Sequence, residues 1–247
     1  MRIAVIADIH GNLPALEAVL ADIKSHAVDL TLDLGDCLSG PLWPAETAAL
    51  LGELRLPTVR GNHDRWLGTV PRALQAPSDA FAFDRTTSEI RERLCTLPAT
   101  LTLTGGVMAF HATPTSDERY LLEDVVGGRM TVARPSSISE RLDGARAPLM
   151  LCGHSHQARI VRGPSGELIV NPGSVGCPGY TDAAPPYGPH ASEAGSPHAR
   201  YAIATERSGC WTAELIAVDY DWMAAARRAE GSGRSDWARA LATGYVA

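Results

Sequence analysis

The stretch Asp8-Ile9-His10-Gly11-Asn12 decides the fold of this chain. An apolar run at residues 3–7 precedes it, and such a run predicts a strand that is buried on both faces of a sheet. Residues 13–23 follow with one apolar face and a proline in the first turn, which predicts an amphipathic helix. Asp8 and His10 therefore stand where a buried strand ends and a helix begins, the edge at which open α/β sheets bind ligands. A carboxylate and an imidazole at that edge are typical metal ligands.

The composition is that of an ordinary globular protein. The chain has 247 residues, of which 45% are hydrophobic and 20% charged, and we expect a single domain over residues 1–247. A net charge of −6 gives no electrostatic footprint for a nucleic-acid polymer. No apolar run approaches the roughly 20 residues of a membrane span and no signal peptide is recognised, so we expect no membrane partner and a cytoplasmic location. The sequence leaves open whether the chain forms a homo-oligomer.

The first half of the chain alternates strand and helix signals, which is typical of an α/β fold. The predicted elements are strands at 30–34, 57–59, 101–103 and 107–110 and helices at 44–54 and, with a break near 76–79, at 65–97. The first three strands of the chain each end in a polar cluster. This repetition predicts a parallel sheet with one functional edge.

The second half turns mainly to strands. The predicted elements are short helices at 121–126 and 136–142 and strands at 149–152, 158–161, 168–170, 201–205 and 212–218. Residues 177–198 are rich in proline, glycine, alanine and serine, which predicts a long irregular loop. Residues 219–245 predict a C-terminal helical segment that is split at a Gly-Ser-Gly sequence. We expect its apolar face, formed by Trp237, Leu241 and Tyr245, to pack on the protein's own sheet.

Metal-ligand side chains gather at five strand ends. They are Asp8, His10, Asp36, Asn62, His63, His111, His154 and His156. Burying so many polar groups without partners would cost roughly 1–3 kcal/mol for each, and a metal centre satisfies them together. Imidazole and carboxylate ligands suit manganese, iron, zinc, nickel or cobalt, and eight ligand groups are too many for one ion. We therefore predict two divalent metal ions, with Asp36 as the carboxylate that bridges them.

The order of these motifs resembles the calcineurin-like metallophosphoesterase superfamily, and within it the compact prokaryotic phosphodiesterase branch. The motifs that carry the resemblance are Asp8-x-His10, Gly35-Asp36, Gly61-Asn62-His63-Asp64, His111, Gly153-His154-Ser155-His156 and Asn171-Pro172-Gly173-Ser174. The resemblance covers about two-thirds of the chain and does not extend beyond Cys177. It implies an αββα sandwich of two sheets, with helices on the outer faces.

The resemblance also implies a ligand set. One metal would be held by Asp8, His10, Asp36 and His156, and the other by Asp36, Asn62, His111 and His154. A hydroxide that bridges two ions about 3.5–4 Å apart would attack the phosphorus atom.

Three further residues receive roles beside the ions. His63 is not a ligand in this family, and it would bind the substrate and protonate the leaving oxygen. Asp64 would orient His63 or cap the helix that follows, and Asn12 would lie near the phosphate or cap its own helix.

The expected reaction is the hydrolysis of a small phosphodiester or phosphomonoester, with a phosphodiester favoured. Protein phosphatases of the superfamily carry an arginine in a Gly-Asp-x-x-x-Arg-Gly arrangement, and Gly40 stands in its place here. Because the bidentate phosphate clamp is missing, a phosphoprotein substrate is disfavoured. Two alternatives remain, a nucleotide pyrophosphatase and a metal-binding interaction scaffold without turnover. His63, which such scaffolds lack, favours the enzyme.

Overall fold

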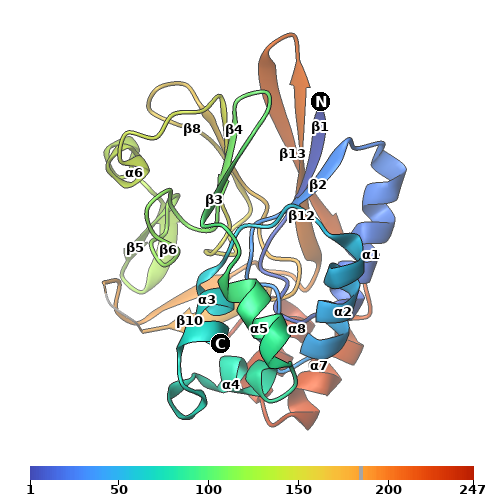
Figure 1. Ribbon diagram of the computed structural model, residues 1–247. Helices are drawn as coiled ribbons and strands as arrows, with labels where there is room; N and C mark the ends of the chain where they lie inside the picture. Colours follow the sequence, from blue (N-terminus) through green and yellow to red (C-terminus); the bar gives the residue numbers. More distant parts are fainter. Residues whose placement is uncertain (184–185) are drawn as a thin grey trace.

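The computed structural model describes residues 1–183 and 186–247 (Figure 1). The first main sheet has the strand order β13-β12-β1-β2. Its strands are β1 (Arg2–Ile6), β2 (Leu30–Asp33), β12 (Ala199–Arg207) and β13 (Cys210–Val218). β1 and β2 run parallel, whereas the hairpin β12–β13 lies antiparallel beside β1. The carboxyl ends of β1 and β2 therefore meet at one edge, as the sequence predicts.

The second main sheet has the order β3-β4-β7-β9-β8. Its strands are β3 (Thr100–Leu103), β4 (Val107–Phe110), β7 (Leu149–Leu151), β8 (Arg159–Arg162) and β9 (Leu168–Asn171). β4, β7 and β9 are parallel to one another. β3 and β4 form the predicted hairpin. The inner face of this sheet packs on that of the first, and the shared core includes Val5, Leu32, Ala109, Leu151 and Val170.

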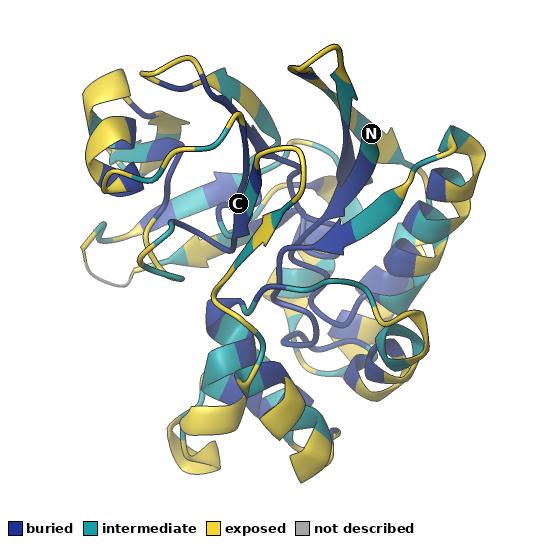
Figure 2. Cartoon of the chain, turned by 45° about the horizontal axis from the view of Figure 1, so that its top comes forward, coloured by how far each residue is buried: buried dark blue, intermediate teal, exposed yellow. Residues whose placement is uncertain are grey.

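Helices cover the outer faces, so the predicted αββα sandwich is confirmed. On the first sheet, α1 (Leu13–Ile23) buries Leu16 and Val19 against Ile6, and α2 (Pro44–Leu54) lies beside it. On the second sheet, α6 (Pro135–Leu142) packs with Phe110 and Met150. Figure 2 shows this division as dark strands inside and yellow helix faces and loop tips outside.

A third, smaller sheet corrects two predictions. It has the order β10-β11-β6-β5 and comprises β5 (Glu123–Val126), β6 (Arg129–Val132), β10 (Gly179–Asp182) and β11 (His190–Glu193). Residues 121–126 were expected to be helical, but β5 instead forms a hairpin with β6 across a tight glycine turn. The expected irregular loop at 177–198 contains β10 and β11, which pair with each other, and residues 184–185 lie outside the described chain.

Short helices fill the segment after the second strand. They are α3 (Asn62–Thr69), η2 (Arg72–Leu74), α4 (Pro77–Phe83) and α5 (Ser88–Cys95), whereas η1 (Lys24–His26) lies earlier, between α1 and β2. The break predicted near 76–79 falls at the start of α4. The third strand predicted at 57–59 is reduced to one parallel bridge, between Thr58 and Asp33. It still brings the next segment, which begins α3, to the same edge of the sheet.

The C-terminal segment forms α7 (Trp222–Gly231) and α8 (Ser235–Thr243), which confirms the predicted helical split. Leu241 packs with Ala225 and Leu42 in a small separate core, with Trp237 beside them. The apolar face of α8 thus packs mainly on α7 and on the loop that follows β2, and not on the two main sheets as expected. Among the described residues, no helix is both long and apolar enough to cross a membrane.

Candidate metal centre

The predicted ligands meet at the carboxyl ends of four strands from both main sheets. Asp8 follows β1, Asp36 follows β2, His111 follows β4, and His154 and His156 follow β7. Backbone hydrogen bonds tie these loops together, from Asp8 N to the Gly35 oxygen (2.9 Å) and from Gly153 N to the His111 oxygen (2.7 Å). The strand pairing and these bonds place side chains from distant parts of the sequence in one site.

The backbone at this edge is strained in a consistent way. Five of the predicted ligands have positive φ angles: Asp8 (56°), His10 (51°), Asp36 (58°), His154 (66°) and His156 (59°). L-residues rarely adopt this left-handed conformation, which costs of order 1–3 kcal/mol and clusters at functional sites. The neighbouring hydrogen bonds hold the five residues there, and their side chains turn inward.

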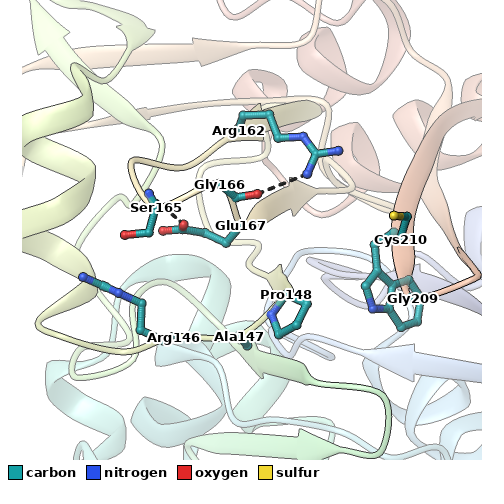
Figure 3. A pocket seen from close by; sticks show the side chains of 10 residues that line it. Arg146, Ala147, Pro148, Arg162, Ser165, Gly166, Glu167, Gly209 and Cys210 are labelled. Atoms are coloured by element: carbon teal, nitrogen blue, oxygen red, sulfur yellow. Dashed lines mark hydrogen bonds between the residues drawn. The ribbon is translucent and has the colours of Figure 1, made fainter.

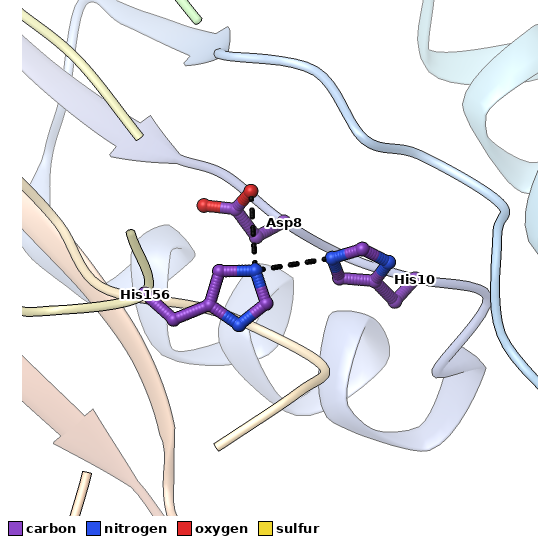
Figure 4. Close-up of side chains that lie close together, drawn as sticks. All are labelled: Asp8, His10 and His156. Atoms are coloured by element: carbon purple, nitrogen blue, oxygen red, sulfur yellow. Dashed lines mark hydrogen bonds and ion pairs between the residues drawn. The ribbon is translucent and has the colours of Figure 1, made fainter. Parts of the chain in front are cut away.

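The first group of ligand atoms comes from Asp8, His10 and His156, and all three residues are buried (Figure 4). Nε2 of His10 lies 3.1 Å from Nε2 of His156, which in turn lies 3.5 Å from Oδ1 of Asp8. The opposite ring nitrogens are held by backbone oxygens, Nδ1 of His10 by Ser39 (2.6 Å) and Nδ1 of His156 by Cys177 (2.7 Å). Because each Nδ1 donates a proton there, each Nε2 is turned toward the shared point and could bind an ion from the neutral ring.

The second group comes from Asp36, His111 and His154. Nε2 of His111 lies 3.3 Å from Oδ2 of Asp36, and its Nδ1 donates to the Leu34 oxygen (2.7 Å). His154 is turned the other way, because its Nε2 donates to the backbone oxygen of Glu118 (3.0 Å). His154 therefore offers Nδ1 to the site, whereas the other three histidines offer Nε2.

Asn62 completes the second group. One atom of its amide lies 3.0 Å from Nε2 of His111, 3.1 Å from Nδ1 of His154 and 3.3 Å from Oδ2 of Asp36. An NH₂ group at this position would donate to all three and suit a site without an ion. A carbonyl oxygen there faces three other acceptors and needs a cation among them. Lone pairs of the imidazoles toward this atom favour the NH₂ group while no cation is bound, and the amide oxygen would take this position when a cation lies among the ligands.

The carboxylates of the site are buried, and the surrounding histidines hold them in the ionised form. Oδ1 of Asp8 has no hydrogen-bond partner although Asp8 is fully buried. Burial opposes ionisation of Asp36, but the nearby His111 and His63 hold the pKa of Asp36 well below its usual value. Burial likewise disfavours protonated His111, yet Asp36 and Asp8 raise the pKa of His111 to about 10. The site thus pairs ionised carboxylates with imidazoles that attract protons, and divalent cations could replace those protons, so the donor set fits such cations.

His63 lies beside the two groups and is more open to solvent. Its side chain is 25% exposed, and its ring centroid is 5.4 Å from that of His10. Nδ1 of His63 bonds Oδ1 of Asp79 at 2.7 Å, and the same oxygen accepts the Ser39 hydroxyl at 2.6 Å. Burial lowers the pKa of His63, but Asp79 and Asp36 outweigh it and raise that pKa to about 9. The ring is therefore protonated at neutral pH and presents Nε2.

Asp79 is a site residue that the sequence reasoning missed. It lies in the first turn of α4, and no sequence spacing relates it to His63. Asp64 instead caps the start of α3, where it accepts from the backbone nitrogens of Gly61 (3.0 Å), Cys37 (3.0 Å) and Asp36 (2.8 Å). The capping alternative is therefore confirmed for Asp64, and the carboxylate that orients His63 is Asp79.

Asn12 also acts as a cap. Its side-chain oxygen accepts from Ala15 N (3.4 Å), while its NH₂ donates to the Gly176 oxygen (3.0 Å) and the Tyr220 hydroxyl (3.1 Å). Asn12 is fully buried. Both amide protons are therefore used inside the protein, and the expected contact of Asn12 with a phosphate finds no support in this geometry.

Two cavities lie around the sandwich at different distances from the centre. One of about 300 Å³ adjoins His111 and is lined by Arg60 and Arg65, but Arg65 already makes two bonds of 2.8 Å to Asp117. Another, of about 440 Å³, is shown in Figure 3. Trp211 and Glu167 line it, at the end of the strands opposite to the centre, and no predicted site residue does.

Comparison with known proteins identifies the class that this fold and site define. The model of the calcineurin-like phosphoesterase superfamily domain matches residues 1–187. The chain is 30% identical over 234 residues to uncharacterized protein MJ0912 of Methanocaldococcus jannaschii, which covers 89% of this chain and 88% of the relative. The chain therefore belongs to the calcineurin-like phosphoesterase superfamily.

Two solved structures show the same fold along almost the whole chain. A metallophosphoesterase from Sphaerobacter thermophilus is 25% identical with a TM-score of 0.73, covering 99% of this chain and 100% of the other. The hypothetical protein PH1004 from Pyrococcus horikoshii has a TM-score of 0.73 at 19% identity, covering 100% and 99%. Because its sequence identity is only 19%, the second comparison supports the fold alone.

Proposed function

We propose that this protein is a dinuclear metal-dependent phosphoesterase that hydrolyses small phosphodiesters or phosphomonoesters. The observation that carries the proposal is the convergence of two buried ligand groups, Asp8 with His10 and His156 and Asp36 with His111 and His154. Asp36 would bridge the two ions, and Asn62 would join the second group. His63, whose side chain is partly exposed to solvent, lies beside the two groups.

The protein's own residues supply the rest of the chemistry. Two divalent ions, when bound, would neutralise the anionic ester and lower the pKa of water. Bonds to backbone oxygens orient the buried imidazoles, which would bind the ions in their neutral form. His63, protonated through its pairing with Asp79, holds a proton at Nε2 for the leaving oxygen.

The packing at Gly40 explains why the substrate should be small. A Cβ atom at Gly40 would lie 2.3 Å from the backbone oxygen of His10 and 3.2 Å from the Trp237 ring. No side chain fits there, so the arginine of the Gly-Asp-x-x-x-Arg-Gly arrangement has no place. Arg65 and Arg119, which could have replaced it, are paired with Asp117 and Glu140. The site therefore lacks a second anchor for a large phosphoprotein substrate.

The experiment is hydrolysis of bis(p-nitrophenyl) phosphate and p-nitrophenyl phosphate by the purified chain. Manganese is the first metal to test, followed by nickel, cobalt, zinc and ferrous iron, because all of them suit mixed nitrogen and oxygen ligands. We expect turnover of both esters, faster for the diester, and its loss after treatment with a chelator. Absence of turnover with every metal would contradict the proposal.

A further inference from the structure

A third cavity, of about 430 Å³, lies between α2 and α5, behind the loop that carries Asp36. This volume falls within the roughly 300–1,000 Å³ of small-molecule sites. Its walls are mostly apolar and comprise Leu38, Ala48, Leu51, Leu56, Leu94 and Leu97. None of the predicted metal ligands lines it. The cavity is therefore separate from the metal centre, although Cys37 and Leu38 of the same loop form part of it.

Two positive charges stand on the exposed side of this cavity. Arg55 ends α2 and Arg93 lies on α5, and both are exposed. The Arg93 side chain lies over Gly52 of α2, where a Cβ atom would be 3.4 Å from Nη1 of Arg93. Within residues 1–183 and 186–247, neither guanidinium makes a side-chain hydrogen bond or an ion pair. Both groups line the same cavity, so an anion bound in it could pair with them.

The cavity shown in Figure 3 provides a contrast. Its arginines already bond to protein, Arg146 to the Ala145 oxygen (2.8 Å) and Arg162 to the Gly166 oxygen (3.1 Å). Glu167 brings a negative charge to its lining. The cavity shown in Figure 3 is therefore less suited to binding an anion than the cavity between α2 and α5.

The floor of the α2–α5 cavity is polar but satisfied within the protein. Asp33 accepts from Gly35 N (3.0 Å) and from the Cys37 thiol (3.5 Å), and the Thr58 hydroxyl donates to the Leu56 oxygen (3.0 Å). Burial raises the pKa of Asp33 to about 8, so its carboxyl is mostly neutral at pH 7. The floor therefore does not repel an anion, and the apolar walls remain free for a hydrocarbon group.

We propose that this cavity binds a small amphipathic anion. Its carboxylate or phosphate head would pair with Arg55 and Arg93, and its apolar body would lie among the leucines of α2 and α5. Both halves of the ligand are required, since the guanidinium groups offer nothing to a hydrocarbon and the leucines offer nothing to a bare anion. The proposal does not depend on the phosphoesterase activity.

The test is calorimetric titration of octanoate into the full chain after removal of metals with a chelator, at pH 7 and low salt. We expect one octanoate to bind per chain, with octan-1-ol and acetate each at least about tenfold weaker. Octyl phosphate distinguishes the head group, and binding of either octyl anion supports the proposal. Failure of both octyl anions to bind, or equal binding of octan-1-ol, would overturn it.

Variants locate the binding site. Arg55→Gln combined with Arg93→Gln should lower the affinity for octanoate or octyl phosphate, whichever binds, by about tenfold or more. Arg239→Gln on α8 removes the same charge from another exposed surface and should leave binding unchanged. Since all three side chains are exposed, folding should not be affected, and circular dichroism checks this. Unchanged binding in the double variant, or equal weakening by Arg239→Gln, would contradict the assignment.

Discussion

The two halves of the candidate metal centre are built differently. In the first, Asp8, His10 and His156 are all buried, all have left-handed backbone and are tied to neighbouring loops. In the second, His154 is only half-buried and is turned by a single bond to the Glu118 oxygen, which lies on an exposed loop. A preorganised, dry group of ligands loses less on binding an ion than an open one. We therefore expect the first half to hold its ion more tightly and the second to exchange it.

Substitution of Asp36 should remove the difference between the two halves, because it should affect both. Asp36→Asn keeps the shape of the side chain but removes the bridging charge. We expect both ions to be lost and activity to fall by more than the roughly 10–100-fold that removal of an outer hydrogen-bond partner costs. Metal content by mass spectrometry and turnover of the diester measure this. Asp117→Asn, a neighbouring carboxylate outside both ligand groups, is the control and should retain both ions.

Two histidine variants separate the halves. His154→Gln should empty the second half and leave one ion bound. The variant removes a ligand of the second half, which also contains His111 and Asn62, and none of the first half. His156→Gln should weaken the tighter site, so that more metal is needed to restore any activity. Metal titration followed by calorimetry compares the two affinities. Equal loss of both ions in both variants would show that the halves do not differ.

His63 should act independently of either half. His63→Ala is expected to retain both ions and to lose about 10²–10⁴-fold in turnover, the usual contribution of a general acid. The loss should be smaller for p-nitrophenyl esters than for alkyl esters, since a good leaving group needs less protonation. A variant that keeps full activity on an alkyl ester would remove His63 from the mechanism.

The smallest expected effect is a change in pH dependence. Asp79 raises the pKa of His63 to about 9, so protonated His63 persists up to that pH. In Asp79→Asn the pKa of His63 should fall, and the alkaline limb of activity should move to lower pH, by about tenfold in activity for each unit at fixed alkaline pH. Asp84, at the end of the same helix, pairs with Arg72, and Asp84→Asn is the control. An unmoved alkaline limb would contradict the role of Asp79.

Local patterns explain what the sequence could predict. Each ligand motif directly follows an apolar strand, so the strand-end position of Asp8, Asp36, His111 and His154 can be derived without knowing the fold. The resemblance to the calcineurin-like superfamily then implied the αββα sandwich. Helix starts such as Thr87, which accepts from Ile90 N at α5, depend only on neighbouring residues.

Non-local contacts account for what was missed. β6 and β11 pair through Arg129 and Ala191, and the sequences of these short polar strands do not predict that pairing. The contact of Asp79 with His63 likewise depends on how α4 packs beside α3, which no spacing encodes. The sequence left open whether Asp64 orients His63 or caps a helix, and only the fold shows that three backbone nitrogens of the same edge donate to its carboxylate.

The central claim is that residues from four strand ends form a cage for two cations, one in each half. The most direct test is to equilibrate the purified chain with manganese, remove the excess, and count bound ions while recording the electron paramagnetic resonance spectrum. We predict two manganese ions per chain and a spectrum of exchange-coupled ions. One ion or none at saturation, or two ions without magnetic coupling, would contradict the account.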